Sequence, residues 1–399
     1  MCIRDSYDAD VEFFDPSNPE DDNPFSDMSF LSEIIKSFSQ QGGQSAKQIA
    51  MAIASGGSSE PNVDPVERIE FENLLRVAEL HVNRVTGLPP SRNGTLSIEP
   101  VTKAGWATQS LDALKPLLSG LASIGTSSFE NLEDTPSEIS EIMTLLAPMM
   151  AEMTTGTMVG HLATRCLGTY DLPIPRQGNR ILLIAPNIDD FGNDWSIPKE
   201  DLRLWICLHE VTLHTILGIP HVRQNLSGLL TQHAENFGKD PSVIQDHFGG
   251  IEIGEGLEGL ESLQNILTPE MVIGAVRSPE QEALLPFLEA LVAIIIGFVD
   301  FTMDEIGNDL ISSYPMMTEA LRRKRVETGE AERFVEKILG LNLTQDQVDR
   351  GKTFVDGIVE RVGSEGLERL WLNEENLPTP NEVDAPGLWL ARVDLENEN

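Results

Sequence analysis

Apolar residues recur at helical spacing along most of this chain, and short polar or Gly- and Pro-containing breaks separate the runs. The clearest run, "VERIEFENLLRVAELHVNRVTGL", is stopped by Gly87 and the Pro89-Pro90 pair. Another opens at "IPKEDLRLW", where Pro198 and the neighbouring acids suit a helix start, and it ends near Gly218. The spacing predicts helices over 66–88, 103–118, 136–163, 199–217, 221–237 and 279–308, with shorter ones over 28–40 and 45–55.

Only one region favours β structure. "GTYDLPIP" (168–175) and "NRILLIAPNI" (179–188) are linked by "RQG" and are typical of a hairpin or of neighbouring strands. The predicted fold class is therefore α+β and mostly α-helical, with a small sheet beside the helix over 199–217.

The most apolar stretch is "ALLPFLEALVAIIIGFVDFTM" (283–303). Pro286, Glu289 and Asp300 interrupt it, which leaves an uncharged run too short for a bilayer core of about 30 Å. It is interpreted as a buried core helix, and no membrane span is expected.

Composition limits the function classes. The net charge of −36 repels nucleic acid phosphates and anionic membranes, so neither is expected as a partner. Cys166 and Cys207 lie in apolar contexts and suit core packing in a reducing compartment, which indicates a cytoplasmic protein. Residues 1–6, "MCIRDS", resemble a translated sequencing adapter rather than part of the fold, and the acidic 7–26 segment is predicted to be a disordered tail.

Candidate chemistry lies in "LWICLHEVTLHTILGIPHV" (204–222). His209-Glu210 begins like the zinc-binding pattern H-E-x-x-H, but the position four residues after His209 is Leu213, and a histidine follows one place later at His214. A helix turns by about 100° per residue, so residues four apart share a face and residues five apart lie about 140° apart. His209 and His214 on a regular helix therefore cannot both reach a zinc ion that binds at about 2.0–2.1 Å.

Several ordered segments resemble one family over about residues 66–393. They are "ENLLRVAELHVNRVTGLP", "LGTYDLPIP", "LLIAPNI", "DLRLWICLHEVT", "LGIPHVR", "GFVDFTMDEIG", "LRRKR", "ILGLNLTQDQVDRGKTFVDGIVERVG" and "LWLNEENLPTPNEVDAPGLWLARV". The chain resembles the zincin-like metallopeptidase type 2 family, which is common in actinobacteria and often labelled as a hydrolase associated with deazaflavin-coenzyme biosynthesis. The sequence pattern predicts N-terminal helices and a linker over 27–63, and the resemblance implies a zincin-like domain over 64–393 with two lobes around the 199–217 and 279–308 helices. Residues 394–399 are expected to form a tail.

The family's zinc site would map here onto four positions. The resemblance places the first histidine ligand on His209 and the general base on Glu210, the second ligand on Leu213, and the glutamate ligand of an E-G-[YH]-x-D stretch on Ile296 of "IGFVD". Two of the three ligand positions thus hold apolar residues. Without an ion, a buried polar ligand costs a few kcal/mol, so paired apolar replacements are coherent with a dismantled site.

The leading interpretation is a family member that has lost zinc and peptidase chemistry, needs no cofactor, and acts as a structural protein or as a binding protein for a peptide or protein ligand. The alternative is an active zinc-dependent peptidase or hydrolase with a rearranged ligand set that uses His209 and Glu210. Weaker metal candidates are His214, and Asp300 with Asp304 one turn apart on the later helix, which could join His209 as mixed nitrogen and oxygen ligands. The basic cluster "LRRKR" (321–325) is expected to pair with acids such as Glu327 and Glu330.

Overall fold

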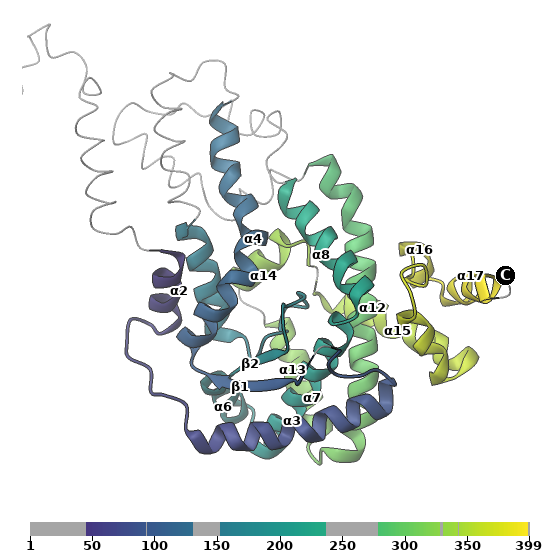
Figure 1. The fold of residues 1–399 in the computed structure, drawn as a ribbon, viewed down its shortest axis with the longest axis horizontal. Helices are drawn as coiled ribbons and strands as arrows, with labels where there is room; N and C mark the ends of the chain where they lie inside the picture. Colours follow the sequence, from purple (N-terminus) through teal and green to yellow (C-terminus); the bar gives the residue numbers. More distant parts are fainter. Residues whose placement is uncertain are drawn as a thin grey trace, which may run out of the picture. The chain divides into compact units, whose positions relative to one another are not determined.

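The computed structural model describes residues 45–92, 94–130, 152–236, 278–327, 330–341 and 343–397, and Figure 1 shows how their helices and strands are arranged. These residues form the predicted mostly helical α+β fold with one small sheet. The elements, in chain order, are α2 (Ala46–Ala54), α3 (Pro65–Thr86), β1 (Ser97–Val101), α4 (Lys103–Glu130), a helix at 152–165, β2 (Arg180–Ile184), α6 (Ala185–Asp194), α7 (Lys199–Leu217), α8 (Pro220–Glu235), α12 (Pro279–Leu310), α13 (Tyr314–Val326), α14 (Glu330–Ile338), α15 (Gln345–Val362), the 3-10 helix η1 (Ser364–Trp371), α16 (Pro380–Val383) and α17 (Pro386–Asn397).

Helix α7 has the predicted bounds, 199–217. Pro198 precedes its first residue, Glu200 and Asp201 lie in its first turn, and Gly218 follows its last. Most of its residues are buried, because α3, α6, α8, α12 and β2 all pack against it. In Figure 1, α7 lies beside α3, which also packs against β1. A helix enclosed in this way holds its side chains at fixed positions, which suits a site.

The sheet corrects the expected strand pairing. Strand β2 lies within the predicted 179–188 run, but its partner is β1, and the two pair in parallel with Ser97 opposite Arg180 and Val101 opposite Ile184. Residues 168–175 form no strand. A parallel pair needs a long crossover, and here it contains α4 and the helix at 152–165. The amides of 167–170 instead donate to the carboxyl groups of Asp171 and Glu210, so these amides need no strand partner.

Helix α12 runs unbroken through Pro286 and is longer than the predicted 279–308. By length and composition it could cross a membrane, contrary to the expectation from its interrupting residues. Its buried residues pack against α15, α8 and α7, as those of a core helix do. A Cβ added at Gly351 of α15 would lie 1.9 Å from the carbonyl oxygen of Ala293, so α12 and α15 approach backbone to backbone.

The remaining helix predictions agree where the structure describes them. The 66–88 run is α3, capped at its end by Gly87 with φ of 67°, and 45–55 and 221–237 correspond to α2 and α8. The 103–118 run is the first part of a longer α4. The predictions for 1–6, 7–26, 28–40 and 136–151 lie outside the described residues, and the two-lobe organisation of 64–393 stays a prediction.

Candidate functional site

One cavity of about 170 Å³ brings together the positions singled out from the sequence. His209, Glu210 and Leu213 reach it from α7, while Ile296 and Asp300 reach it from α12. Its other lining residues come from the 162–173 region, α7, α12, α13 and the α14–α15 region: Leu162, Cys166, Leu167, Tyr170, Asp171, Leu172, Pro173, Trp205, Ile206, Val299, Leu321, Lys324, Arg325, Glu336, Leu343 and Val348. The walls are mostly apolar, with a few charged groups, as in many small-molecule and peptide pockets.

His209 is half-buried in the cavity wall and stacks on Trp205, one turn earlier in α7. The ring centroids are 4.8 Å apart and the planes are inclined by 16°. Burial lowers the pKa of His209 to about 4, although the negative charge of Asp171 acts in the opposite direction. The imidazole is therefore neutral near pH 7. The spacing of four residues between Trp205 and His209 was the sequence signal for this stack.

Glu210 is buried, and its carboxyl group binds backbone rather than side chains. Its two oxygens accept hydrogen bonds from the amide of Thr169 at 2.9 Å and from the amide of Tyr170 at 3.1 and 3.2 Å. Burial raises the pKa of Glu210 well above its usual range, and the charge of Asp171 raises it further. The two amides and the buried guanidinium of Arg176 act in the opposite direction. Both oxygens of this carboxyl group therefore take part in contacts that hold the backbone in place.

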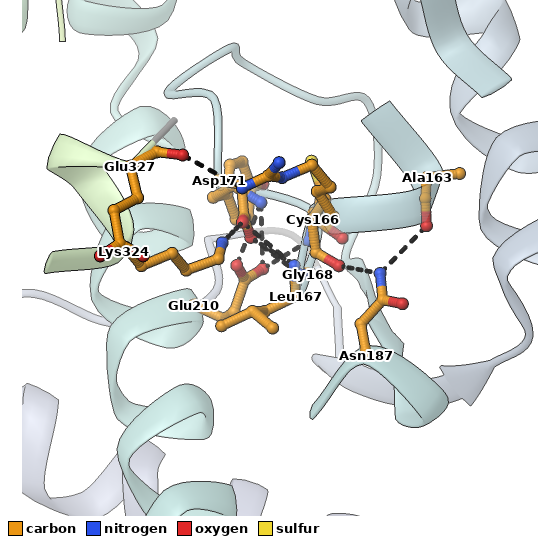
Figure 2. A network of polar contacts seen from close by, with 12 residues as sticks. Ala163, Cys166, Leu167, Gly168, Asp171, Asn187, Glu210, Lys324 and Glu327 are labelled. Atoms are coloured by element: carbon orange, nitrogen blue, oxygen red, sulfur yellow. Dashed lines mark hydrogen bonds and ion pairs between the residues drawn. The ribbon is translucent and has the colours of Figure 1, made fainter. Parts of the chain in front are cut away.

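Asp171 binds in the same way the amides of the two residues that precede Thr169. Its carboxylate accepts from the amide of Leu167 at 3.0 Å and from the amide of Gly168 at 2.9 Å. Lys324 of α13 forms an ion pair with it at 3.2 Å. Figure 2 shows Glu210 and Asp171 at this short segment, with Lys324 reaching Asp171. Four consecutive amides, 167 to 170, are therefore bound by two carboxyl groups, an arrangement that we call the amide clamp.

Other contacts fix the clamped segment from behind. The carbonyl of Gly168 accepts from the Trp106 indole at 2.9 Å, and the amide of Ile184 donates to the carbonyl of Leu167 at 2.8 Å. The side chain of Asn187 donates to the carbonyls of Ala163 and Cys166, at 3.0 and 2.7 Å (Figure 2). A Cβ added at Gly168 would lie 2.4 Å from Oε1 of Glu210, so only glycine allows this approach. Sequence reasoning missed the clamp, for which the glycine in "LGTYD" was the one signal.

His214 does not line the cavity. Its side chain is buried, and Nδ1 lies 2.9 Å from the hydroxyl of Tyr170. Burial lowers the pKa of His214 to about 4, and the charge of Arg223 lowers it further. The offset of five residues from His209 places it where the helix turn predicts, away from any site that His209 faces.

The two aspartates of α12 have different surroundings. Asp300 lines the cavity, and burial raises the pKa of its carboxyl while the charge of Arg325 acts against that rise. Asp304 is not a lining residue; it accepts from the Tyr314 hydroxyl at 2.9 Å and pairs with Lys352 at 3.0 Å. Asp300 and His209 thus share a cavity, whereas Asp304 has a structural role.

The basic cluster pairs with acids, among them Glu319 and Asp171. Arg322 and Arg323 form ion pairs with Glu319 at 2.9 and 2.6 Å, and Lys324 pairs with Asp171. Arg325 lines the cavity. The cluster therefore contributes one wall of the cavity, a role that its sequence did not reveal.

The side chains at the mapped ligand positions do not fit a zinc ion. Catalytic zinc takes three protein ligands from Cys, His, Asp or Glu, and Leu213 and Ile296 offer none. Within the described ranges, no three His, Cys, Asp or Glu side chains form a group that could hold a metal ion. Of the candidates, only His209 and Asp300 remain as a nitrogen and an oxygen donor in the cavity.

The sequence model of the zincin-like metallopeptidases matches residues 43–390. A crystal structure of a candidate hydrolase with a novel fold from Chloroflexus aurantiacus is similar, with a TM-score of 0.61 and 22% sequence identity over 88% of this chain and 97% of that one. At this identity the likeness concerns the fold. No curated protein matches the chain.

The clamp predicts a strong effect of one methyl group. In Gly168→Ala the new Cβ would collide with the Glu210 carboxyl, which two amides hold in place, so we expect a loss of about 1–3 kcal/mol of unfolding free energy. Chemical denaturation measures it. The matched control is Gly228→Ala in α8, where the nearest atom would be 4.0 Å away; this change should be neutral or slightly stabilising. Equal effects of the two changes would contradict the clamp.

The buried histidines predict a pH dependence. His214 takes up a proton near pH 4 when folded but near its ordinary pKa of about 6.5 when unfolded, so acid favours the unfolded chain. The stability contributed by its neutral form is present above pH 6.5 and is lost as the pH falls toward 4. In the His214→Gln variant, the decrease in unfolding free energy as the pH falls should be smaller than in wild type by on the order of 3 kcal/mol. Chemical denaturation at pH 7 and pH 4.5 measures how the unfolding free energy changes with pH. The control is His161→Gln, at an exposed position, which should leave that change as it is in wild type.

Proposed function

The chain belongs to the zincin-like metallopeptidase family, and we propose that it keeps the family's fold and cleft but does not assemble a zinc site for peptide hydrolysis. It acts instead by binding a peptide or protein segment in the cavity between α7 and α12. The observation that carries this proposal is that Leu213 and Ile296 line the same cavity as His209 and Glu210.

The meeting of these positions supports the family alignment. Leu213 and Ile296 lie 83 residues apart, on different helices, yet they share one cavity with His209. That proximity is what a common ligand set would require. Both are apolar, so the cavity holds hydrocarbon where an ion would need donors.

The state of Glu210 supports the same proposal. A general base must reach the water that it deprotonates. Here both carboxyl oxygens accept backbone hydrogen bonds from Thr169 and Tyr170. The residue therefore has a structural reason to persist that is independent of catalysis.

The cavity itself supports binding. Its apolar walls from α7, α12 and α13 would contact a side chain, while Asp300, Lys324 and Arg325 offer polar groups at its edge. A volume of about 170 Å³ suits one side chain better than a drug-sized molecule. We therefore infer that a single residue of a peptide or protein ligand enters it.

A zinc-dependent hydrolase with a rearranged ligand set is the competing proposal. It is favoured by one observation, that His209 and Asp300 line the same cavity as nitrogen and oxygen donors. The other carboxyl groups of the lining are those of Asp171 and Glu210, which bind amides, and that of Glu336. Among the residues that the structure describes, no three His, Cys, Asp or Glu side chains form a group that could hold a metal ion. Binding without zinc is therefore preferred.

Rebuilding the ligand set tests the proposal. Leu213→His and Ile296→Glu should each destabilise by about 1–3 kcal/mol, because each places a polar group in an apolar wall. The double variant should regain thermal stability when zinc is added, since an ion that binds only the folded state stabilises it. Thermal melting of wild type, singles and double, with and without zinc, measures this.

Two controls make the result specific. Adding His209→Ala to the double variant should abolish the zinc effect. Leu217→His with Ile296→Glu also places a histidine in a buried leucine position of α7, but Leu217 does not line the cavity, so zinc should not stabilise it. If zinc raises the melting temperature of the double variant no more than that of wild type, the four positions are not a ligand set.

A further inference from the structure

The charged groups that line the cavity are more often acidic than basic. Its four carboxyl groups and two cations are those of Asp171, Glu210, Asp300, Glu336, Lys324 and Arg325. Glu210 binds amides, and Asp171 forms an ion pair with Lys324 (Figure 2). Even with Glu210 set aside, three carboxyl groups accompany two cations, so the lining suits a positively charged ligand group better than a negative one.

Asp300 lines the cavity without a close protein partner. Among the residues that the structure describes, its carboxyl group forms no hydrogen bond and no ion pair, and Arg325 and Lys352 act on it through their charges alone. The residue is half-buried in a mostly apolar wall. A carboxylate in such a place costs free energy unless a cation pairs with it. A ligand cation that enters the cavity meets this requirement.

The ring of His209 supplies a further acceptor. It stacks on Trp205, but within the described ranges it forms no hydrogen bond. A neutral imidazole has one nitrogen that accepts a hydrogen bond. Together with the two oxygens of Asp300, the cavity thus offers three acceptors to which no described residue donates.

The wall near these acceptors is apolar. Leu213 lies one turn after His209 on α7, and Ile296 lies one turn before Asp300 on α12. All four residues line the cavity, so each helix brings one apolar and one polar side chain to it. A lysine side chain is divided in the same way, into a four-carbon stem and an ammonium group with three donors.

Lysine matches this set of groups better than arginine does. The three donors of an ammonium group equal the three acceptors of Asp300 and His209. A guanidinium group carries five donors, so two of them would find no acceptor there, which costs free energy. An uncharged apolar side chain would contact the walls but would leave the Asp300 carboxyl group without a partner.

We propose that the residue entering the cavity is a lysine of the bound peptide or protein, with its stem between Leu213 and Ile296 and its ammonium group at Asp300 and His209. This inference rests on the proposed function, because it names the ligand residue of the same cavity. Asp300 then determines the specificity for that residue. The net charge of −36 attracts a basic segment to the chain, an effect that salt screens.

Peptide pools test this assignment. Each pool holds pentapeptides that are acetylated and amidated at their ends, with lysine, norleucine or glutamate at the centre and random uncharged residues around it. Equilibrium dialysis against the full chain at physiological ionic strength gives the dissociation constants. Wild type should bind the lysine pool about tenfold more tightly than either other pool. Asp300→Asn should lose that preference, whereas Asp304→Asn, one turn later and outside the cavity lining, should keep it.

The outcomes separate this inference from the proposed function. Leu213→Phe and Ile296→Phe each enlarge a lining side chain and should weaken the binding of every pool. If the lysine and norleucine pools bind wild type equally and both of these variants weaken them, the cavity binds peptides and lysine is the wrong residue. If no pool binds wild type, both proposals fail. Equal effects of Asp300→Asn and Asp304→Asn overturn the choice of lysine, and so does tighter binding of an arginine-centred pool or of a norleucine pool with free N-termini.

Discussion

The amide clamp is the constraint around which the candidate site is organised. Buried backbone N–H groups must find acceptors, and leaving one unpaired costs about 1–3 kcal/mol. Four consecutive groups at 167–170 find them in Glu210 and Asp171. Through these carboxyl groups the segment is tied to α7 and, by Lys324, to α13. The clamp thus fixes the loop that forms one wall of the cavity.

This constraint accounts for an otherwise puzzling combination of residues. Glu210 is kept because its loss would leave two buried amides without acceptors, and His209 contributes a ring stacked on Trp205. Leu213 and Ile296 have no such partners and are apolar, as expected of cavity walls without an ion. A histidine and a glutamate can therefore persist from a zinc motif for reasons of packing and hydrogen bonding alone.

Helical periodicity was sufficient to predict much of the fold. The bounds of α7 follow from its apolar spacing, Pro198 and Gly218, and the turn of about 100° per residue placed His214 off the cavity. The strand pairing was not predictable in this way. Strand β1 is five residues long, contains Pro100, and pairs with β2 across some 80 residues, so no local pattern marks it.

Contacts between distant segments limited the prediction of the site. "GTYDLPIP" alternates like a strand, yet its amides bind carboxyl groups, because Glu210 and Asp171 compete with a strand partner for them. Asp304 shares a helix with Asp300, but Tyr314 and Lys352 occupy its oxygens. Sequence spacing gives the face of a helix on which a side chain lies, and only tertiary structure gives the partner that it meets there.

The zinc content of the untagged, full-length protein tests the central claim most directly. Elemental analysis after purification without chelating columns or chelators gives zinc per chain for wild type and for His209→Ala. If the cavity is a dismantled zinc site, wild type carries far less than one zinc per chain and His209→Ala does not differ from it. One zinc per wild-type chain that is lost in His209→Ala would contradict the account and establish a rearranged zinc site at this cavity.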